Sequence, residues 1–377
     1  MKITIDARLY GLENAGLGRY VMNLIDELTK IDSKNKYILL LRKKYFVSLS
    51  FPANFQKVLA DYHHYTFKEQ IFLPFLLYRY WPDVVHFPHF NVPLLYLRKY
   101  IVTLHDLIMH KFEKEETTTL PKLLYIIKRI GYKIVFSLVV RRAYKIIVPS
   151  QFVKNDVYKN YSDINIGKII CTYEGFTDKY SPNNISDYTL TKYKVKKPYI
   201  VYYGNVYPHK NLNILLEAIK EANDKDIRIN LFLSTPKNVF AEKLFSLIRK
   251  YKLNDYVTFP GFVEDDELSV ILKSSLSFVY PSLLEGFGLQ GIEAMGSGTL
   301  LLASDIEVFR EIYKDKAIYF DPLNKLSLIA AIKKVLNMEE KERDEWVRQG
   351  LLLAKSYSWA KMAKETLSVY EESSNSL

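Results

Sequence analysis

The stretch YPSLLEGFGLQGIEAMGSG, residues Tyr280–Gly298, combines the end of a short strand with a glycine-rich loop, a short helix and a glycine-rich stop. Its loop contains one acid, Glu285, and a second acid, Glu293, follows about two helical turns later. Carboxylates at this spacing can each accept hydrogen bonds from a pair of sugar hydroxyls. Two surface acids around a helix cap are the alternative, but the apolar neighbours predict that most of this helix is packed inside: Phe287, Leu289, Ile292 and Met295.

The same alternation of strand and helix extends outward from this stretch over the whole chain. Short β-branched or aromatic runs cover residues 2–6, 37–41, 84–87, 101–105 and 145–148, then 199–203, 227–233, 256–259, 276–280, 299–303 and 317–320. Such alternation is typical of parallel sheets with helices on both faces. Because a single core stops growing at about 250–300 residues, the 377-residue chain predicts an α/β protein with two doubly wound, Rossmann-like domains facing across a cleft.

The boundary between the domains is expected in the polar segment 177–197, which contains Ser181-Pro-Asn-Asn184 and a lysine-rich run before Pro198. We therefore predict an N-terminal domain over residues 1–182 and a C-terminal domain over residues 183–356. The segment 357–377 contains a helical pattern and is expected to pack back on the N-terminal domain.

Composition restricts the compartment and the partners. The start MKITIDARLYG has no apolar signal region, no stretch of about 18 apolar residues occurs, and Cys171 stands alone, so we expect a cytoplasmic protein. The net charge of +11 favours an anionic partner, which could be a nucleotide diphosphate, an anionic membrane surface or nucleic acid. The aromatic residues are spread along the chain without a basic-aromatic signature, so nucleic acid is not expected as a partner.

Candidate site residues follow the predicted strands, as ligand-binding residues do in open α/β sheets. Gly16 and Gly18 lie in a glycine-rich turn before a helix, where backbone N–H groups can approach a phosphate, although such a segment can equally be an ordinary turn. His105 closes the run 101–105, and its capping by the neighbouring Asp106 in a loop is the alternative to a role in chemistry.

Lys210 lies at the start of a predicted helix, after Gly204 and Asn205. A cation is poorly placed there for the helix dipole unless an anion sits between the two, so the sequence predicts a phosphate at this point. A solvated lysine is the alternative. No metal is expected, because His86 and His89 have no third ligand at suitable spacing and the acids at 264–267 suit a helix N-terminus.

With these residues in place, the sequence resembles the retaining glycosyltransferase family 4, which has the GT-B fold, and within it the bacterial polysaccharide enzymes described as mannosyltransferases. Glu285 and Glu293 match the E-x7-E signature of that family. Other landmarks follow in order over nearly the whole chain: Gly16-Leu-Gly-Arg-Tyr20, Thr103-Leu-His-Asp106, Ile147-Val-Pro-Ser150, Gly204 to Asn211, Asp321-Pro322 and Ser358-Trp359.

The resemblance implies a role for each matching residue. Glu285 and the backbone amides of Gly286, Phe287, Gly288 and Leu289 would hold the donor sugar. Glu293 would hold the ribose and Lys210 the pyrophosphate, which Gly16 and Gly18 would approach from the other domain. His105 would lie beside the transferred sugar. The family has an arginine where this chain has Asn205, so one cation is missing there.

The expected reaction is transfer of a hexose with retention of configuration and without a metal or other cofactor. The donor is expected to be GDP-mannose or a UDP-hexose, and the acceptor a saccharide or a lipid-linked saccharide in surface polysaccharide synthesis. A sugar-nucleotide epimerase and a non-catalytic subunit that binds a nucleotide sugar are the alternatives. The segment 122–142 is predicted to be a helix whose apolar and basic residues suit peripheral docking at the inner face of the membrane, with core packing as the alternative for its apolar side.

Overall fold

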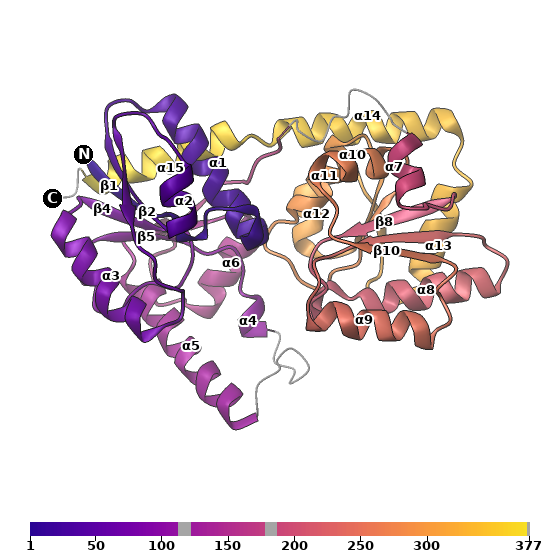
Figure 1. The fold of residues 1–377 in the computed structure, drawn as a ribbon, viewed down its shortest axis with the longest axis horizontal. Helices are drawn as coiled ribbons and strands as arrows, with labels where there is room; N and C mark the ends of the chain where they lie inside the picture. The colour runs from indigo at the N-terminus through magenta and orange to yellow at the C-terminus, as the bar shows by residue number, and fades with distance from the viewer. Residues whose placement is uncertain (112–121, 178–186, 375–377) are drawn as a thin grey trace. The chain divides into compact units, whose positions relative to one another are not determined.

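The computed structural model describes residues 1–111, 122–177 and 187–374. The chain forms two compact units (Figure 1). The N-terminal unit comprises Met1–Gly175 and Ser358–Leu377, and the C-terminal unit comprises Phe176–Tyr357. No helix in the described ranges is long and apolar enough to span a membrane.

The division between the units falls at Gly175, earlier than the boundary at residue 182 expected from the sequence. A Cβ atom on Gly175 would lie 2.1 Å from the backbone nitrogen of Trp359, so this glycine is packed within the N-terminal unit. A Cβ atom on Gly296 would lie 2.0 Å from the ring of Phe176, so the next residue is packed within the C-terminal unit. Residues 178–186 of the expected linker lie outside the described residues.

The N-terminal unit is built on a parallel sheet with the strand order β3-β2-β1-β4-β5-β6-β7. Its strands are β1 (Lys2–Asp6), β2 (Lys36–Leu41), β3 (Phe55–Leu59), β4 (Val84–Phe87), β5 (Tyr100–Thr103), β6 (Lys145–Val148) and β7 (Ile169–Cys171). Its helices are α1 (Ala15–Ile31), α2 (Lys43–Ser48), α3 (Phe67–Tyr80), α4 (Ile108–Lys111), α5 (Lys122–Arg142), α6 (Gln151–Asn160) and α15 (Trp359–Ser374). The two edge strands β3 and β7 were not among the strands expected from the sequence.

Helices cover both faces of this sheet because its strands are apolar on both sides. On one face α3, α5 and α6 share a core with the strands, to which they contribute Leu73, Leu77, Phe136, Val139 and Val157. On the other face α15 packs against α1, and the two helices lie side by side in Figure 1.

A buried histidine fixes α15 to the sheet. His86 on β4 is fully buried, and its two ring nitrogens lie 2.6 Å from the hydroxyl of Tyr370 on α15 and 2.8 Å from the hydroxyl of Thr103 on β5. Burial lowers the pKa of His86 to about 3, so its ring is neutral near pH 7. The side chain that could have suggested a metal ligand therefore holds the C-terminal helix in place.

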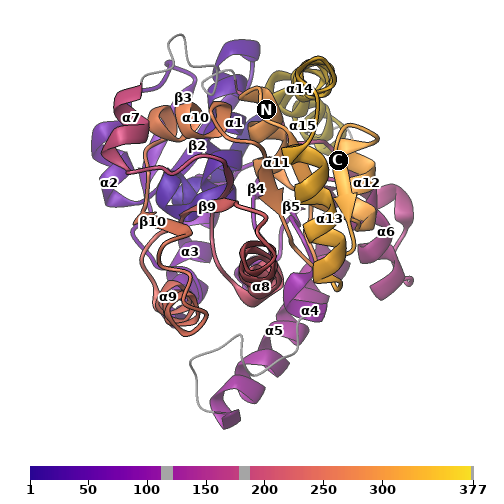
Figure 2. The same cartoon turned by 90° about the vertical axis from the view of Figure 1, so that its right-hand side faces the viewer.

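The C-terminal unit is built on a second parallel sheet with the strand order β10-β9-β8-β11-β12-β13. Its strands are β8 (Tyr199–Tyr203), β9 (Asn230–Ser234), β10 (Val257–Gly261), β11 (Phe278–Tyr280), β12 (Leu301–Ser304) and β13 (Ile318–Phe320). Its helices are α7 (Asp187–Lys192), α8 (Leu212–Asp224), α9 (Val239–Lys250), α10 (Asp265–Lys273), α11 (Leu289–Gly296), α12 (Glu307–Tyr313), α13 (Lys325–Leu336) and α14 (Glu340–Ser356). Figure 2 shows α8, α9 and α13 beside the strands of this sheet, and these helices share its core.

The acids at 264–267 lie where the sequence placed them, at a helix N-terminus. Helix α10 begins at Asp265, and its first turn contains Asp265, Asp266 and Glu267. Negative charge there complements the helix dipole. Glu267 in addition accepts hydrogen bonds from Lys192 and from the hydroxyl of Tyr193.

Candidate functional site

The C-terminal unit places a buried ion pair after two neighbouring strands. Glu285 lies in the loop after β11, and Lys210 ends a short 3-10 turn, Pro208–Lys210, after β8. The Lys210 Nζ atom lies 2.5 Å from Glu285 Oε1, and the two side chains are only 11% and 9% exposed. The structure thus brings together two residues that are far apart in the sequence and that were both expected at the donor site.

Two helix N-termini without side-chain caps adjoin this pair. Helix α8 starts directly after Lys210, and its N-cap residue Asn211 donates its side-chain amide to the carbonyl of Pro322 instead of capping the helix. Helix α11 follows Glu285, and its N-cap is Gly288, which has no side chain to offer. Free N–H groups at helix N-termini favour anions, so this part of the unit can bind a phosphate.

Glu285 is a carboxylate at neutral pH. Burial by itself would raise the pKa of this group, but Lys210 and then His209 hold the pKa below its usual range. Burial, and next the charge of Lys210, lowers the pKa of His209 to about 4, so Lys210 is the cation of this cluster. The Lys210 ammonium also lies 5.4 Å from the centre of the Tyr280 ring.

The shape of the loop from Glu285 to α11 depends on glycine and on Tyr313. Gly288 has a φ of +94°, and a Cβ atom on it would lie 2.2 Å from the Tyr313 hydroxyl. That hydroxyl donates a hydrogen bond of 2.5 Å to the Gly288 carbonyl. Neighbouring Phe287 is buried and packs its ring against Tyr357. Phe287 can therefore meet a donor only through its backbone.

Glu293 lies inside α11 and is tied to the end of β8. Its Oε2 atom accepts a hydrogen bond of 2.9 Å from the Tyr203 hydroxyl, and Gln290 donates to the Tyr203 carbonyl. A Cβ atom on Gly204 would lie 2.0 Å from the Gln290 side chain, so the glycine permits this contact. The following residue, Asn205, accepts a hydrogen bond on its backbone carbonyl from Tyr202.

In the N-terminal unit, His105 follows β5 and is held between two acceptors. Its Nδ1 atom lies 3.3 Å from Glu174 Oε1, and its Nε2 atom lies 3.1 Å from the carbonyl oxygen of Pro88. Both neighbouring oxygens are hydrogen-bond acceptors, so these two contacts fix the orientation of the ring. Asp106 accepts from the backbone N–H of Ile108. The carboxylate that contacts His105 is Glu174, which no feature of the sequence indicated.

The two predicted glycines differ in their surroundings. A Cβ atom on Gly18 would lie 1.9 Å from the carbonyl oxygen of Gly11, so this glycine is required for α1 to pack. Gly16 is exposed and has nothing within 4 Å of such a Cβ atom. The N-cap residue of α1, Asn14, donates its side chain to the carbonyl of Leu9 and leaves the helix N-terminus uncapped.

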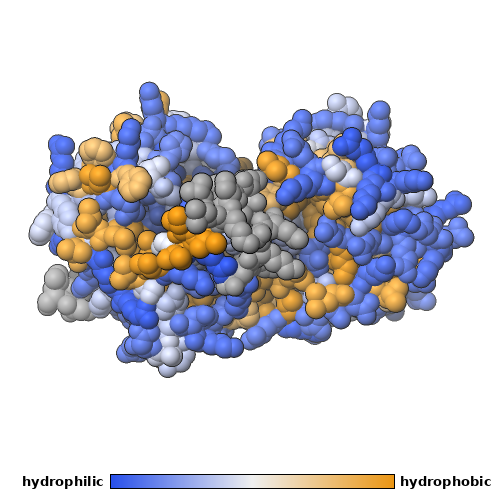
Figure 3. Space-filling model, turned by 90° about the horizontal axis from the view of Figure 1, so that it is seen from below, coloured by the Kyte–Doolittle hydropathy of each residue, from blue (hydrophilic) through white to orange (hydrophobic). Residues whose placement is uncertain are grey.

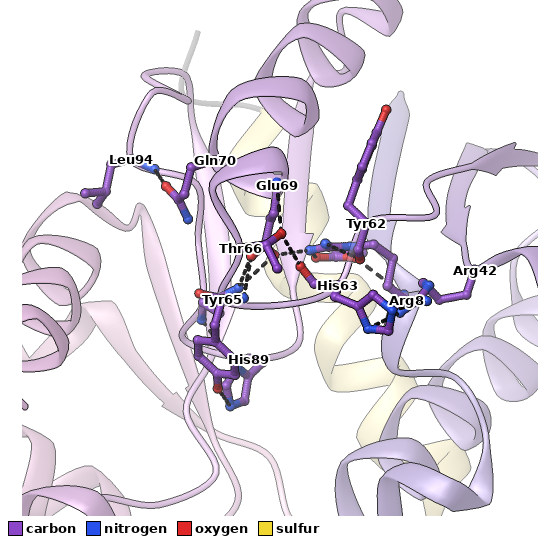
Figure 4. Close-up of polar contacts among 12 residues, drawn as sticks. Arg8, Arg42, Tyr62, His63, Tyr65, Thr66, Glu69, Gln70, His89 and Leu94 are labelled. Carbon is purple, nitrogen blue, oxygen red and sulfur yellow. Dashed lines mark hydrogen bonds and ion pairs between the residues drawn. The ribbon is translucent and has the colours of Figure 1, made fainter. Parts of the chain in front are cut away.

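A buried charge network, which the sequence did not reveal, supports the same edge of the N-terminal sheet (Figure 4). Arg8, directly after β1, forms ion pairs of 2.5 Å with Asp6 and 2.7 Å with Glu69 on α3. Glu69 also accepts from the side-chain amide of Asn91 and from the backbone N–H of Tyr65. The charged residues after the first strand were a usable signal, but nothing in the sequence indicated Glu69.

Comparison with known proteins identifies the class. The family model for Glycosyl transferases group 1 matches residues 191–351. Sucrose-phosphate synthase from Thermosynechococcus elongatus superposes with a TM-score of 0.77 at 18% identity, over 99% of this chain and 98% of that chain. Anabaena HepE in complex with UDP-glucose superposes with a TM-score of 0.73 at 14% identity, over 98% and 99%. The fold is GT-B, as the sequence predicted, and the chain contains a glycosyltransferase group 1 domain.

Two relatives in sequence are O-antigen chain mannosyltransferases. The O-antigen chain mannosyltransferase RfbU of Salmonella typhimurium is 28% identical over 66% of this chain and 63% of its own length. The O-antigen chain mannosyltransferase B of Escherichia coli is 25% identical over 76% of this chain and 74% of its own length. Together with the group 1 domain, these relatives support a glycosyltransferase as the class of the protein.

Proposed function

We propose that the chain transfers a hexose, with mannose as the first choice, from a nucleotide diphosphate sugar to a saccharide or lipid-linked acceptor. The observation that carries the proposal is the buried pair of Lys210 and Glu285 beside the uncapped N-termini of α8 and α11. One cation and two sets of backbone N–H groups suit a diphosphate, and the adjoining carboxylate suits sugar hydroxyls.

Departure of the diphosphate is the demanding step in this reaction. Breaking the bond between the anomeric carbon and the phosphate oxygen leaves the electron pair, and negative charge, on the leaving group. Lys210 and the helix N–H groups are placed to stabilise that charge as it develops. Because these groups come from the protein, we propose a reaction without a metal or other cofactor.

We propose that transfer retains the configuration of the sugar by front-face substitution. The acceptor hydroxyl forms the new bond to the anomeric carbon, and its proton passes to the departing phosphate oxygen. Glu285 is held in an ion pair with Lys210, which suits binding of hydroxyls better than nucleophilic attack. A covalent sugar adduct on Glu285 would contradict this proposal.

The remaining site residues are assigned as follows. We assign the backbone amides of Gly286, Phe287, Gly288 and Leu289 to the sugar. Glu293 is assigned to the ribose, whose hydroxyls would compete with the Tyr203 hydroxyl for the carboxylate. Gly16 and Gly18 lie at the uncapped start of α1, which we assign as a phosphate-binding element of the N-terminal unit. We assign the His105 side chain, which is oriented by Glu174, to the transferred sugar.

The names of the relatives support mannose, since two of them are O-antigen chain mannosyltransferases. The complex of Anabaena HepE with UDP-glucose supports a nucleotide diphosphate sugar as the donor class. For this reason UDP-hexoses remain candidate donors together with GDP-mannose. The product then belongs to a bacterial surface polysaccharide, made at the cytoplasmic side of the membrane.

The proposal is tested with the purified chain and a panel of nucleotide sugars. The true donor should raise the melting temperature most, because a ligand at 100 times its dissociation constant contributes about 2.7 kcal/mol of stability. Transfer of that sugar to a saccharide or lipid-linked acceptor should follow. Conversion of the donor without any acceptor would indicate an epimerase, and binding without transfer would indicate a non-catalytic subunit.

A further inference from the structure

Helix α3 exposes an apolar side to solvent. Phe67, Ile71 and Phe75 recur every four residues, so they lie on one side of the helix. They are 90%, 47% and 69% exposed, whereas Leu73 and Leu77 on the other side are buried in the core. Packing in the core therefore explains Leu73 and Leu77 but not Phe67, Ile71 and Phe75.

Helix α5 repeats this arrangement. Ile126, Ile130, Ile134 and Leu138 recur every four residues and are 40–55% exposed. The residues that α5 buries lie on its other side, at Phe136, Val139 and Val140. Core packing, the alternative left open by the sequence, thus accounts for the buried side of α5 but not for its exposed side. Helix α5 also extends well beyond the sheet of its unit (Figures 1 and 2).

The segment 94–97 joins the two helices into one face. The Tyr78 hydroxyl on α3 accepts from the N–H of Leu97 and donates to the carbonyl of Leu95. The Arg142 guanidinium on α5 donates to the carbonyls of Leu94 and Tyr96. Leu95 and Leu97 are themselves exposed. We call the outward sides of α3 and α5, with residues 94–97, the docking face, and apolar side chains gather on the N-terminal unit in the view from this side (Figure 3).

The excess of basic over acidic residues lies in the unit that contains the docking face. The sequence of the N-terminal unit holds 28 Lys and Arg against 18 Asp and Glu, a net charge of +10, whereas the C-terminal unit holds 25 against 24, a net charge of +1. Within α3 and α5 the one acid is Glu69, which is fully buried against Arg8. Lys128 and Lys133 are exposed beside the apolar residues of α5.

We propose that the docking face binds the surface of an anionic lipid bilayer. Helices that lie in a membrane interface combine an apolar side with flanking basic residues, as α3 and α5 do. Large exposed apolar patches are uncommon on monomeric proteins and mark interaction sites. A second copy of the chain is a poorer occupant, because a symmetric contact would bring the same basic helices against each other.

The charge network in Figure 4 connects this face to the sheet edge that contains His105. Arg8 holds Glu69 in the first turn of α3, and Thr66 caps that turn by accepting from the Glu69 N–H. Docking through α3 therefore keeps the carboxyl edge of the N-terminal sheet close to the bilayer. If the proposed function is right, this arrangement favours a lipid-linked acceptor, but binding to the bilayer itself does not depend on the reaction.

The test is co-sedimentation of the full chain with vesicles of phosphatidylglycerol and phosphatidylethanolamine, compared with phosphatidylcholine alone. The test variants are Phe75→Ser with Ile130→Gln, which removes apolar contacts, and Lys128→Glu with Lys133→Glu, which reverses charge. The control variants, Leu323→Ser and Lys333→Glu, change exposed residues of the same kinds in the C-terminal unit. Circular dichroism and melting establish that each variant is folded.

We expect each test variant to bind anionic vesicles at least about tenfold more weakly. Basic residues near an anionic surface add to the affinity for it, and so does the apolar area buried in the interface. Both controls should bind like the wild type, and phosphatidylcholine should bind weakly. Equal binding by folded test variants and controls would overturn the proposal, as would equal binding to both kinds of vesicle. A concentration-dependent dimer that Phe75→Ser dissociates, without vesicle binding, would assign the face to a second copy instead. None of these outcomes depends on the identity of the donor.

Discussion

Replacement of Lys210 by alanine should affect both the stability and the activity of the protein, and the structure indicates how large each effect is. Lys210 and Glu285 are 2.5 Å apart and only 11% and 9% exposed. Removal of the lysine leaves the Glu285 carboxylate buried without its cation. Breaking a buried pair in this way costs about 3–5 kcal/mol, so Lys210→Ala should unfold at markedly lower denaturant concentration.

The same substitution removes the cation proposed for the leaving diphosphate. Loss of one donor aimed at developing charge costs about 2.7–4 kcal/mol in the transition state, or a hundred- to thousand-fold in rate. The variant should therefore be nearly inactive under conditions in which it is still folded. The resemblance to glycosyltransferase family 4 implies an arginine at the position of Asn205, so Asn205→Arg should tighten binding of the diphosphate and slow its release.

A second variant separates the two effects. Lys210→Met with Glu285→Gln removes both charges while keeping the volume, so it should recover most of the lost stability but none of the activity. Lys220→Ala on α8 is the matched control, because its partner Asp224 is exposed and one helical turn away, and it should resemble the wild type in both respects.

Three measurements decide the outcome: urea denaturation, calorimetry with the nucleoside diphosphate, and turnover with the nucleotide sugar. Wild-type turnover and unchanged diphosphate affinity in folded Lys210→Ala would refute the phosphate assignment. Unchanged stability would refute the importance of the buried pair. Recovery of activity in the double variant would show that neither charge takes part in the reaction.

Three further predictions follow from the described contacts. His105→Ala should lower kcat far more than it raises the KM for the donor, since a group beside the reacting carbon acts mainly in the transition state. A change in KM alone would show that His105 does not act on the reacting carbon. Tyr313→Phe removes the hydrogen bond to the Gly288 carbonyl and should weaken donor binding measurably by calorimetry, whereas unchanged affinity would mean that the loop holds its shape without it. Burial lowers the pKa of His86 to about 3, below its unfolded value near 6.5, so its contribution to stability is complete above about pH 6.5 and is lost as the pH falls towards 3, at up to about 1.4 kcal/mol per pH unit. Denaturation at a series of pH values checks this, and the same slope in a folded His86→Gln variant would contradict it.

The sequence alone predicted the two doubly wound sheets and the positions of most of their strands. Strand–helix alternation is a local pattern, and right-handed crossovers then leave few topologies. The edge strands β3 and β7 were missed because their patterns are weak: in β3 the consecutive polar residues Gln56 and Lys57 interrupt the apolar residues, and β7 has only three residues. An edge strand pairs on one side only, so its sequence is less constrained.

The sequence also placed Lys210 and Glu285 in one site, since both follow strands whose carboxyl ends meet at one edge of a sheet. Their direct ion pair, however, was not predictable. A family pattern indicates which residues face a ligand but not which of them contact each other.

Only the tertiary structure decided the contacts between distant segments. Arg8 meets Glu69 across 61 residues, His105 meets Glu174 across 69, and His86 meets Tyr370 across 284. The tertiary structure also decided which side of α3 and of α5 faces solvent. The spacing of apolar residues shows that a helix has two apolar sides, but it does not show which side is buried in the core. Packing is a property of the whole chain, and for this reason the docking face became visible only once the sheet beneath it was in place.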